Sequence, residues 1–229
     1  MNNQWLEKLL SDPDMLEMGH GQTAEDLNLG LGWIYYSLAR VYRPQRVVCI
    51  GSWRGFVPML IARGMQDNLE PGSVTFIDPG MVDDHWQDAD QVRAWFADHA
   101  VPNIQHYRMT TQQFVTTAVY QDLDRIDMLF VDGLHIQQQA RFDHASFEHK
   151  MSPRSITLFH DSMTRFHSPI YGADRKYEFS VCDYITELKQ RPDLQVMDLP
   201  FENGLTLVRQ LKPVSSSISI PVSCNIGRR

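Results

Sequence analysis

Short apolar runs alternate with longer amphipathic stretches through most of the 229-residue chain. The apolar runs have the length of buried strands, whereas the amphipathic stretches repeat apolar residues every three or four positions, as helices do. Because right-handed crossovers join such units, the alternation predicts an α/β fold with a mostly parallel sheet and helices on both faces. The predicted strands cover residues 46–51, 73–78, 103–108, 127–132 and 155–161. The predicted helices cover residues 53–65, 90–99, 111–120, 137–150 and 181–190.

The segment before the first strand repeats apolar residues at alternating steps of four and three. This spacing predicts one amphipathic helix that starts at Thr23 and is ended by Pro44. Thr23 together with Asp26 resembles a capping box at its start. We therefore expect residues 1–43 to form a helical cap on the sheet.

The region after the fifth strand has a different pattern. Residues 162–180 are rich in aromatic and charged side chains, which is typical of an active-site loop. Further on, Asn203 and Gly204 separate apolar runs at 194–200 and 205–210, which predicts an antiparallel hairpin. The complete prediction is a Rossmann-like, doubly wound, mostly parallel seven-stranded sheet with an antiparallel C-terminal hairpin.

Length and composition predict a single domain over residues 1–212, followed by a tail at 213–229. The tail is predicted to be flexible or to pack on a partner, such as a second copy in a homo-oligomer. The net charge of −7 argues against nucleic-acid binding. The start lacks the pattern of a signal peptide, and no apolar run reaches membrane-spanning length. Three cysteines without a CxxC pair favour the reducing cytoplasm.

Three of the five predicted parallel strands end in a carboxylate: Asp78, Asp132 and Asp161. Ligands of open α/β sheets bind at these carboxyl ends, so the carboxylates are candidate site residues. Asp132 and Asp161 would end neighbouring strands about 4.8 Å apart, where two carboxylates need a shared proton, a basic partner or a divalent cation.

Oxygen ligands alone favour Mg²⁺ or Ca²⁺, whereas His160 or His135 would admit Mn²⁺, Fe²⁺ or Zn²⁺. The alternative is a site without metal, in which Asp132 faces a cofactor and Asp161 caps a loop.

The turn after the first strand reads Gly51-Ser52-Trp53-Arg54-Gly55. Glycine lets a backbone approach a cofactor closely, although a tight turn without a ligand has the same composition. The turn lacks the G-x-G-x-x-G of nicotinamide and flavin sites and the GxxxxGK[ST] of a P-loop. Asp78, after the second strand, could accept hydrogen bonds from ribose hydroxyls, or it could cap a turn.

Histidines offer a candidate general base. His135 follows Asp132 by three positions and is the kind of residue that takes a proton near neutral pH. A histidine that caps the following helix is the alternative. Of the other histidines, His20 and His167 are candidates for the lining of a substrate opening.

The motifs RVVCIGSWRGF, VTFIDP, RMTTQQF, IDMLFVDGLH and ITLFHDS together resemble the class I S-adenosylmethionine (SAM)-dependent methyltransferases. The resemblance covers about residues 23–210 and is strongest to the small-molecule O-methyltransferase-like group, which includes cephalosporin-pathway and macrolide-sugar enzymes. It implies that the first glycine turn binds the methionine part of SAM, Asp78 the ribose, and Thr110 with Thr111 the adenine. The implied cofactor-binding residues are Gly51, Ser52, Trp53, Gly55, Asp78, Thr110 and Thr111.

By the same resemblance, Asp132, His160 and Asp161 match the positions that hold Mg²⁺ or another divalent cation in metal-dependent members. Such a cation lowers the pKa of a substrate hydroxyl and orients it toward the methyl group, with Asp132 and His135 as the catalytic residues. The implied activity is O-methylation of a small hydroxylated molecule.

Two residues depart from the family pattern. Cys49 stands where the first strand usually carries an acid, and Met109 stands where a glycine often follows the third strand. Cys49 motivates one alternative, a catalytically degenerate binding or scaffold protein on the same fold. A nicotinamide-dependent oxidoreductase is a second alternative, against which the missing glycine fingerprint speaks. A serine hydrolase is disfavoured because the G-x-S-x-G elbow is absent.

Overall fold

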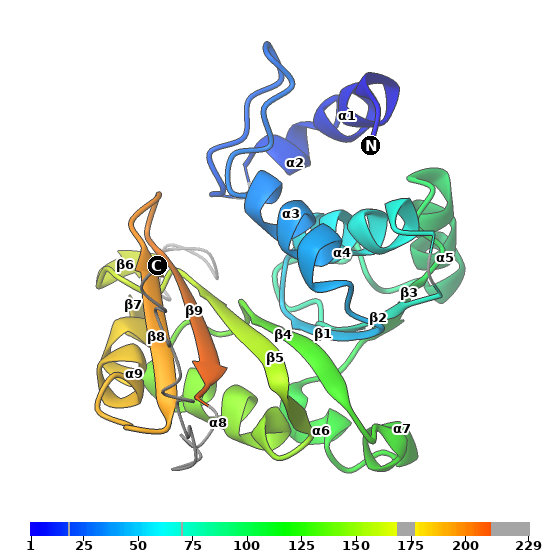
Figure 1. Ribbon diagram of the computed structural model, residues 1–229. Coiled ribbons are helices and arrows are strands. Elements are labelled where there is room, and N and C mark those ends of the chain that lie inside the picture. The colour runs from blue at the N-terminus through cyan, green and yellow to red at the C-terminus, as the bar shows by residue number, and fades with distance from the viewer. Residues whose placement is uncertain (18, 70, 169–176, 212–229) are drawn as a thin grey trace, which may run out of the picture.

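A seven-stranded sheet runs through the described part of the chain, residues 1–17, 19–69, 71–168 and 177–211 of the computed structural model (Figure 1). Its strand order is β3-β2-β1-β4-β5-β9-β8. Strands β1 to β5 pair in parallel, whereas β9 is antiparallel to both β5 and β8. This sheet confirms the predicted fold, hairpin included. The strands are β1 Arg46–Ile50, β2 Ser73–Ile77, β3 Ile104–Tyr107, β4 Ile126–Val131, β5 Met151–His160, β8 Leu194–Leu199 and β9 Leu205–Gln210.

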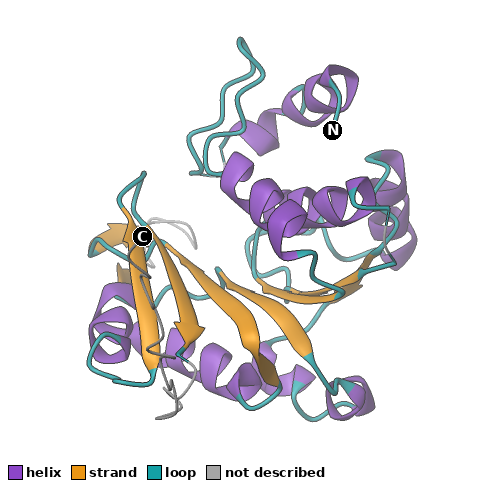
Figure 2. Cartoon of the chain, viewed as in Figure 1, coloured by secondary structure: helices purple, strands orange, loops and turns teal. Residues whose placement is uncertain are grey.

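Helices cover both faces of the sheet (Figure 2). One face carries α3 Gly32–Tyr42, α4 Phe56–Asp67 and α5 Ala89–Asp98, with α1 Asn3–Leu10 and α2 Pro13–Leu16 packed beyond them. The other face carries α6 Thr111–Phe114, α7 Ala118–Asp122, α8 Gln137–Glu148 and α9 Val181–Leu188. Side chains alternate across a strand, so β1 contributes to two separate cores. Val47 and Cys49 lie in the first core, and Val48 and Ile50 lie in the second.

The helix predicted from Thr23 is wrong in its first part, because regular helix begins only at Gly32. Thr23 pairs with Asn28 in an isolated antiparallel bridge, and its hydroxyl donates to the Asp26 carboxylate instead of capping a helix. Gly30 has a φ of +53°, and a Cβ there would lie 2.0 Å from the carbonyl oxygen of His20. The close packing of this turn on His20 therefore overrides the helical periodicity of the sequence.

The helix predicted at residues 111–120 is also wrong in part, because it is broken into α6 and α7. Thr117 adopts an extended conformation between them, and its hydroxyl accepts a hydrogen bond from the Tyr120 amide at 3.2 Å. Val115, Thr116 and Thr117 are β-branched, which lowers helix propensity, and a threonine N-cap is a stable alternative.

The loop predicted at 162–180 contains a small antiparallel pair, β6 Phe166–Ser168 and β7 Tyr177–Phe179. Residues 169–176 of that loop and the tail predicted at 213–229 lie outside the described residues.

Candidate active site

The carboxyl ends of β1, β2, β4 and β5 open into a cleft of about 1040 Å³. It lies where the strand order reverses between β1 and β4, which is the usual ligand position in a doubly wound sheet. Most of the residues expected at the site line this one cleft. They are Gly51, Ser52, Trp53, Asp78, Thr110, Thr111, Asp132, His135, His160 and Asp161.

The glycine turn after β1 has an unusual backbone. Gly51 has a φ of +73°, and a Cβ there would lie 2.1 Å from the carbonyl oxygen of Asp132, so the turn packs directly on the end of β4. Ser52 and Trp53 also have positive φ angles, 141° and 36°. Non-glycine residues in this region carry strain, and such residues cluster at ligand sites.

Two tryptophans and an arginine hold this strained turn in place. Trp86 donates its indole N–H to the carbonyl of Trp53 at 2.5 Å, and Trp95 donates to that of Arg54 at 3.3 Å. The Arg54 side chain forms ion pairs with Asp14 and Asp83. The turn is therefore tied to α5 and to the N-terminal segment.

Gly55 differs from the other cofactor candidates. It is not among the residues that line the cleft, and a Cβ there would lie 3.1 Å from the Phe96 ring and 3.4 Å from the Trp86 ring. Its φ of +82° instead lets the chain enter α4 against these aromatics.

Cys49 and Met109, the two departures from the family pattern, lie in different places. Cys49 is fully buried in the core beneath α3 and α4, where burial raises the pKa of its thiol. Met109 lines the cleft. The cysteine therefore changes the core and leaves the cleft lining intact.

Asp78 follows β2 and faces the cleft with a largely free carboxylate. One oxygen accepts a hydrogen bond from the Gly80 amide at 2.7 Å. Burial raises the pKa of the Asp78 carboxyl to about 6, more than the Gly80 bond lowers it. An anionic acceptor that is costly to bury gains stability when a ligand hydroxyl donates to it.

Thr110 and Thr111 begin α6 at the same edge of the cleft. Thr110 is the N-cap, forms a reciprocal capping box with Gln113, and accepts the Gln113 amide at 3.3 Å. Thr111 is buried, and its side chain lowers the pKa of the Asp143 carboxyl group. Both residues therefore have structural tasks, and both also line the cleft.

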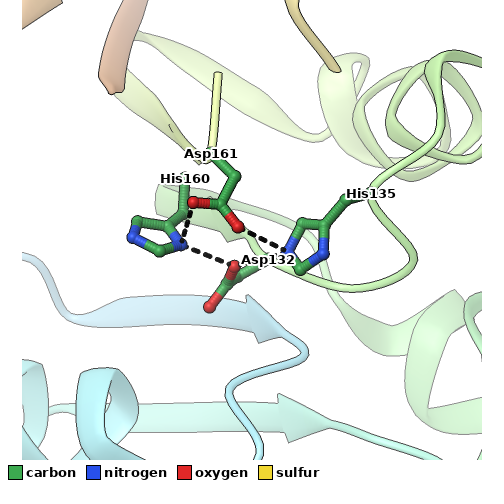
Figure 3. A group of neighbouring side chains, drawn as sticks. All are labelled: Asp132, His135, His160 and Asp161. Atoms are coloured by element: carbon green, nitrogen blue, oxygen red, sulfur yellow. Dashed lines mark hydrogen bonds and ion pairs between the residues drawn. The ribbon is translucent and has the colours of Figure 1, made fainter. Parts of the chain in front are cut away.

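Asp132 is the centre of a cluster of four side chains from the ends of β4 and β5 (Figure 3). One of its oxygens lies 2.9 Å from Nε2 of His135 and 3.0 Å from Nδ1 of His160. Asp161 completes the group, with carboxylate oxygens 3.8 Å from the His135 nitrogen and 3.6 Å from the His160 nitrogen. The predicted convergence of Asp132 and Asp161 is confirmed.

The charges of this cluster compensate one another. Burial alone would raise the pKa of Asp132, but the charge of His160 and hydrogen bonds from His135 and His160 hold it well below its ordinary value. For His160, burial would lower the pKa, but the charge and hydrogen bond of Asp132 raise it to about 9. Without another cation, a protonated His160 therefore neutralises the Asp132 carboxylate.

The donor set fits a divalent cation. One ligand atom from each of Asp132, His135, His160 and Asp161 can be chosen so that all four lie within 4.8 Å of one another. Among the described residues, Oδ1 of the buried Asp161 has no hydrogen-bond partner. Asp161 also has a left-handed φ of +48°, so its position is held against backbone strain. Two imidazoles and two carboxylates suit Mn²⁺, Fe²⁺ or Zn²⁺ better than an all-oxygen site would.

His20, a candidate from the sequence for the lining of a substrate opening, lies beside the Asp132 cluster. His20 lines the cleft, and its ring centroid lies 4.2 Å from that of His160. Burial and the neighbouring His160 lower the pKa of His20, and the Tyr35 hydroxyl lies 3.3 Å from its Nδ1. His167, the other candidate, is not among the lining residues.

Phe179 and Asp143 also line the cleft, although neither residue was predicted from the sequence. Phe179 stacks on His135 with ring centroids 4.3 Å apart. Asp143 is a buried residue of α8. Phe179 lies in the segment 162–180 that was predicted to be an active-site loop, but its pattern does not single out this aromatic. An acid in a helix, such as Asp143, is common without function.

Residues 48–162, half of the chain, match the family model of a methyltransferase domain. The chain belongs to this methyltransferase family. The match confirms the class I SAM-dependent methyltransferase recognised in the sequence and favours it over the nicotinamide oxidoreductase. None of the described helices combines the length and the hydrophobicity needed to cross a bilayer.

Solved structures share the methyltransferase fold at low sequence identity. The O-methyltransferase TomG of Streptomyces achromogenes, involved in tomaymycin synthesis and bound to SAM, has a TM-score of 0.62 and 16% identity, and 93% of this chain and 92% of TomG are covered. A Bacillus cereus O-methyltransferase in complex with SAH, the demethylated product of SAM, has a TM-score of 0.63 and 13% identity, with 92% of each chain covered.

A curated relative is longer than this methyltransferase. The uncharacterized protein y4gI of Sinorhizobium fredii is 25% identical over 191 residues, which are 82% of this chain and 19% of y4gI. The chain thus spans about a fifth of the length of that relative.

Proposed function

We propose that this methyltransferase transfers the methyl group of SAM to a hydroxyl of a small molecule with the help of a divalent cation. One observation carries the proposal: the Asp132 cluster opens into the same cleft as the strained glycine turn and the Asp78 carboxylate. A nucleoside site and a cation site in one cleft fit a cofactor and an acceptor held side by side.

The proposed cofactor contacts lie at the carboxyl ends of β1, β2 and β3. The backbone of Gly51 and Ser52 would contact the methionine part of SAM, and the Asp78 carboxylate would accept hydrogen bonds from the ribose hydroxyls. Thr110 and Thr111 would lie beside the adenine. The two O-methyltransferases named above were solved with SAM or SAH, which supports this choice of cofactor.

The acceptor half is the Asp132 cluster. When held by Asp132, His160 and Asp161, a divalent cation would lower the pKa of an acceptor hydroxyl and hold its oxygen. His135 would take the hydroxyl proton as the acceptor oxygen attacks the methyl carbon, and the carbon–sulfur bond of SAM would break to release SAH. Asp132 would orient His135 by accepting a hydrogen bond from its Nε2–H at 2.9 Å. The sulfonium is reactive already, so alignment is the main contribution of the protein.

Calorimetric titration with SAM and with SAH tests the cofactor part of the proposal. We expect saturable binding of both, whereas no heat at millimolar SAM would contradict it.

Titration of the EDTA-treated protein with Mn²⁺ tests the cation part independently of any acceptor. If Mn²⁺ does not bind and EDTA leaves methyl transfer unchanged, the cation site is wrong, although SAM binding could still hold.

The affinity for SAH is expected to fall about tenfold between pH 7.5 and pH 5 through Asp78. The pKa of this carboxyl in the free protein is about 6, so its proton is bound at pH 5 and must leave before ribose hydroxyls can donate to both oxygens. One group with this pKa is about nine-tenths protonated one unit lower, which sets the tenfold figure. Calorimetry at both pH values measures the effect.

Asp78→Asn is the matched control for this titration. It should bind SAH more weakly at pH 7.5 and lose about tenfold of the pH dependence. A variant that keeps the full wild-type dependence would show that another group is responsible.

A further inference from the structure

His20 comes from the N-terminal segment and lies at the acceptor half of the cleft. The residue is only 2% exposed, yet it lines the cleft. Its ring stacks on that of Phe56 with centroids 5.2 Å apart, and its centroid lies 4.2 Å from that of His160. Because His160 is a candidate cation ligand, this position places the His20 ring beside the Asp132 cluster.

The backbone of His20 is fixed on both sides. The flanking residues Gly19 and Gly21 have φ angles of +71° and +70°, which favour glycine. The His20 amide donates to the Gln22 side chain at 3.0 Å, and the His20 carbonyl accepts a hydrogen bond from the Leu31 amide at 2.8 Å. The ring therefore holds its position without an acceptor, so that little conformational entropy is lost when an acceptor binds to it.

The two ring nitrogens of His20 have different surroundings. Nδ1 lies 3.3 Å from the hydroxyl of Tyr35, a fully buried residue. This hydroxyl has no other hydrogen-bond partner among the described residues, and a buried donor without an acceptor is costly, so Tyr35 donates to Nδ1. A neutral imidazole whose Nδ1 accepts a hydrogen bond carries its proton on Nε2.

Nε2 of His20 is thus an unused donor. It has no hydrogen-bond partner among the described residues, yet it keeps some exposed surface, whereas Nδ1 of His135 and Nε2 of His160 are fully buried. Phenylalanine would fill the same position against Phe56 without the cost of burying a polar ring. A histidine here therefore indicates that a ligand in the cleft accepts the Nε2 proton in a hydrogen bond.

We propose that His20 binds the acceptor by donating a hydrogen bond from Nε2 to an acceptor oxygen held at the Asp132 cluster. This inference rests on the proposed function, because only a cation site at that cluster brings an acceptor oxygen to His20. The contact strengthens when the acceptor hydroxyl loses its proton, since a hydrogen bond to an oxyanion is roughly twice as strong as one to a neutral oxygen. His20 thereby favours acceptors that present an oxyanion at the cation, and the proton itself still passes to His135.

Two substitutions separate hydrogen bonding from packing. His20→Gln loses the ring but keeps an N–H donor near the position of Nε2, whereas His20→Phe keeps a ring against Phe56 and loses the donor. If His20 donates to the acceptor, the glutamine variant should bind the acceptor better than the phenylalanine variant does. If the His20 ring only packs, the order should be the opposite.

The probe is 4-nitrocatechol, whose visible absorption changes as its hydroxyls ionise, titrated into the protein loaded with Mn²⁺ and SAH. We expect His20→Phe to raise the Kd of 4-nitrocatechol at least about tenfold and His20→Gln to stay within about threefold of the wild-type protein. Wild-type affinity in His20→Phe, or weaker binding by His20→Gln than by His20→Phe, would overturn the proposal.

Calorimetry with Mn²⁺ and with SAH is the control, and both affinities should be unchanged in the two variants. If His20→Phe loses Mn²⁺ or SAH affinity as strongly as 4-nitrocatechol affinity, the residue acts on the cation or the cofactor and the proposal is wrong.

Nitrogen-15 NMR of the histidine-labelled wild-type protein with Mg²⁺ and SAH tests the same point without a mutation, in case a variant does not fold. We expect the proton of His20 on Nε2 and a shift of that resonance when 4-nitrocatechol binds. A proton on Nδ1, or no shift at saturation, would contradict the proposal. A protein that binds SAH and Mn²⁺ but not 4-nitrocatechol has no oxyanion site beside His20, which refutes this inference alone. Absence of SAH and Mn²⁺ binding would instead refute the proposed function.

Discussion

Replacing Asp132 by Asn is expected to lower methyl transfer by about 10³-fold or more and to remove tight Mn²⁺ binding. One oxygen of Asp132 lies within 3.0 Å of both the His135 and His160 nitrogens, so the substitution removes a candidate cation ligand and the acceptor that orients the candidate base. Loss of a positioned general base alone costs about 10²–10⁴-fold, and loss of a metal ligand adds to this. SAH binding should weaken only a few fold, because its proposed contacts lie elsewhere.

Two measurements check this expectation. Transfer of a radiolabelled methyl group from SAM to a panel of catechols and sugars reports activity, and Mn²⁺ electron paramagnetic resonance reports the cation site. Asp122→Asn is the matched control, since it removes a carboxylate from an exposed position at the end of α7 and should change neither reading. If Asp132→Asn keeps wild-type activity, the cluster takes no part in catalysis. If neither protein transfers a methyl group, although both bind SAH, the alternative of a degenerate binding protein gains support.

The sheet could be predicted from the sequence because its strands and its hairpin turn have recognisable local sequence patterns. The run Val47–Ile50 is apolar throughout, since a central parallel strand is buried on both faces, and Asn203 with Gly204 specifies the hairpin. Parallel strands also bring their carboxyl ends to one edge. For that reason the sequence alone predicts that Asp132 and Asp161 lie near each other.

Long-range packing could not be predicted in the same way. The helical periodicity after Thr23 is real, but the turn at Gly30 packs on the backbone of His20, and that contact joins segments whose encounter no local pattern specifies. The position of the His20 ring beside that of His160 depends on the same turn. Asp143 was missed because its place in the cleft lining depends on how α8 packs on the sheet, which the sequence of the helix does not specify.

Gly51→Ala is expected to destabilise the protein by about 3 kcal/mol or more and to abolish SAH binding. The added Cβ would lie 2.1 Å from the carbonyl oxygen of Asp132 and 2.7 Å from the Cα of Gly133, both backbone atoms that cannot rotate away. The φ of +73° adds the strain of a left-handed alanine. Overpacking and strain each cost about 1–3 kcal/mol. The clash can be relieved only if the ends of β1 and β4 move apart. That movement would shift both the glycine turn and the Asp132 cluster.

Gly80→Ala is the control for Gly51→Ala, because it adds the backbone strain without the clash. Gly80 has a similar φ of +66°, but the nearest atom to a Cβ there is 3.4 Å away, an ordinary contact. This control should therefore cost only about 1 kcal/mol, the penalty for a left-handed residue. Urea unfolding of the wild-type protein, Gly51→Ala and Gly80→Ala measures the loss of unfolding free energy in each variant. SAH calorimetry at a temperature where all three are folded measures binding. Equal destabilisation by the two substitutions would mean that the β1 turn can move away from Asp132, and the cofactor and cation halves of the cleft would then not be rigidly joined.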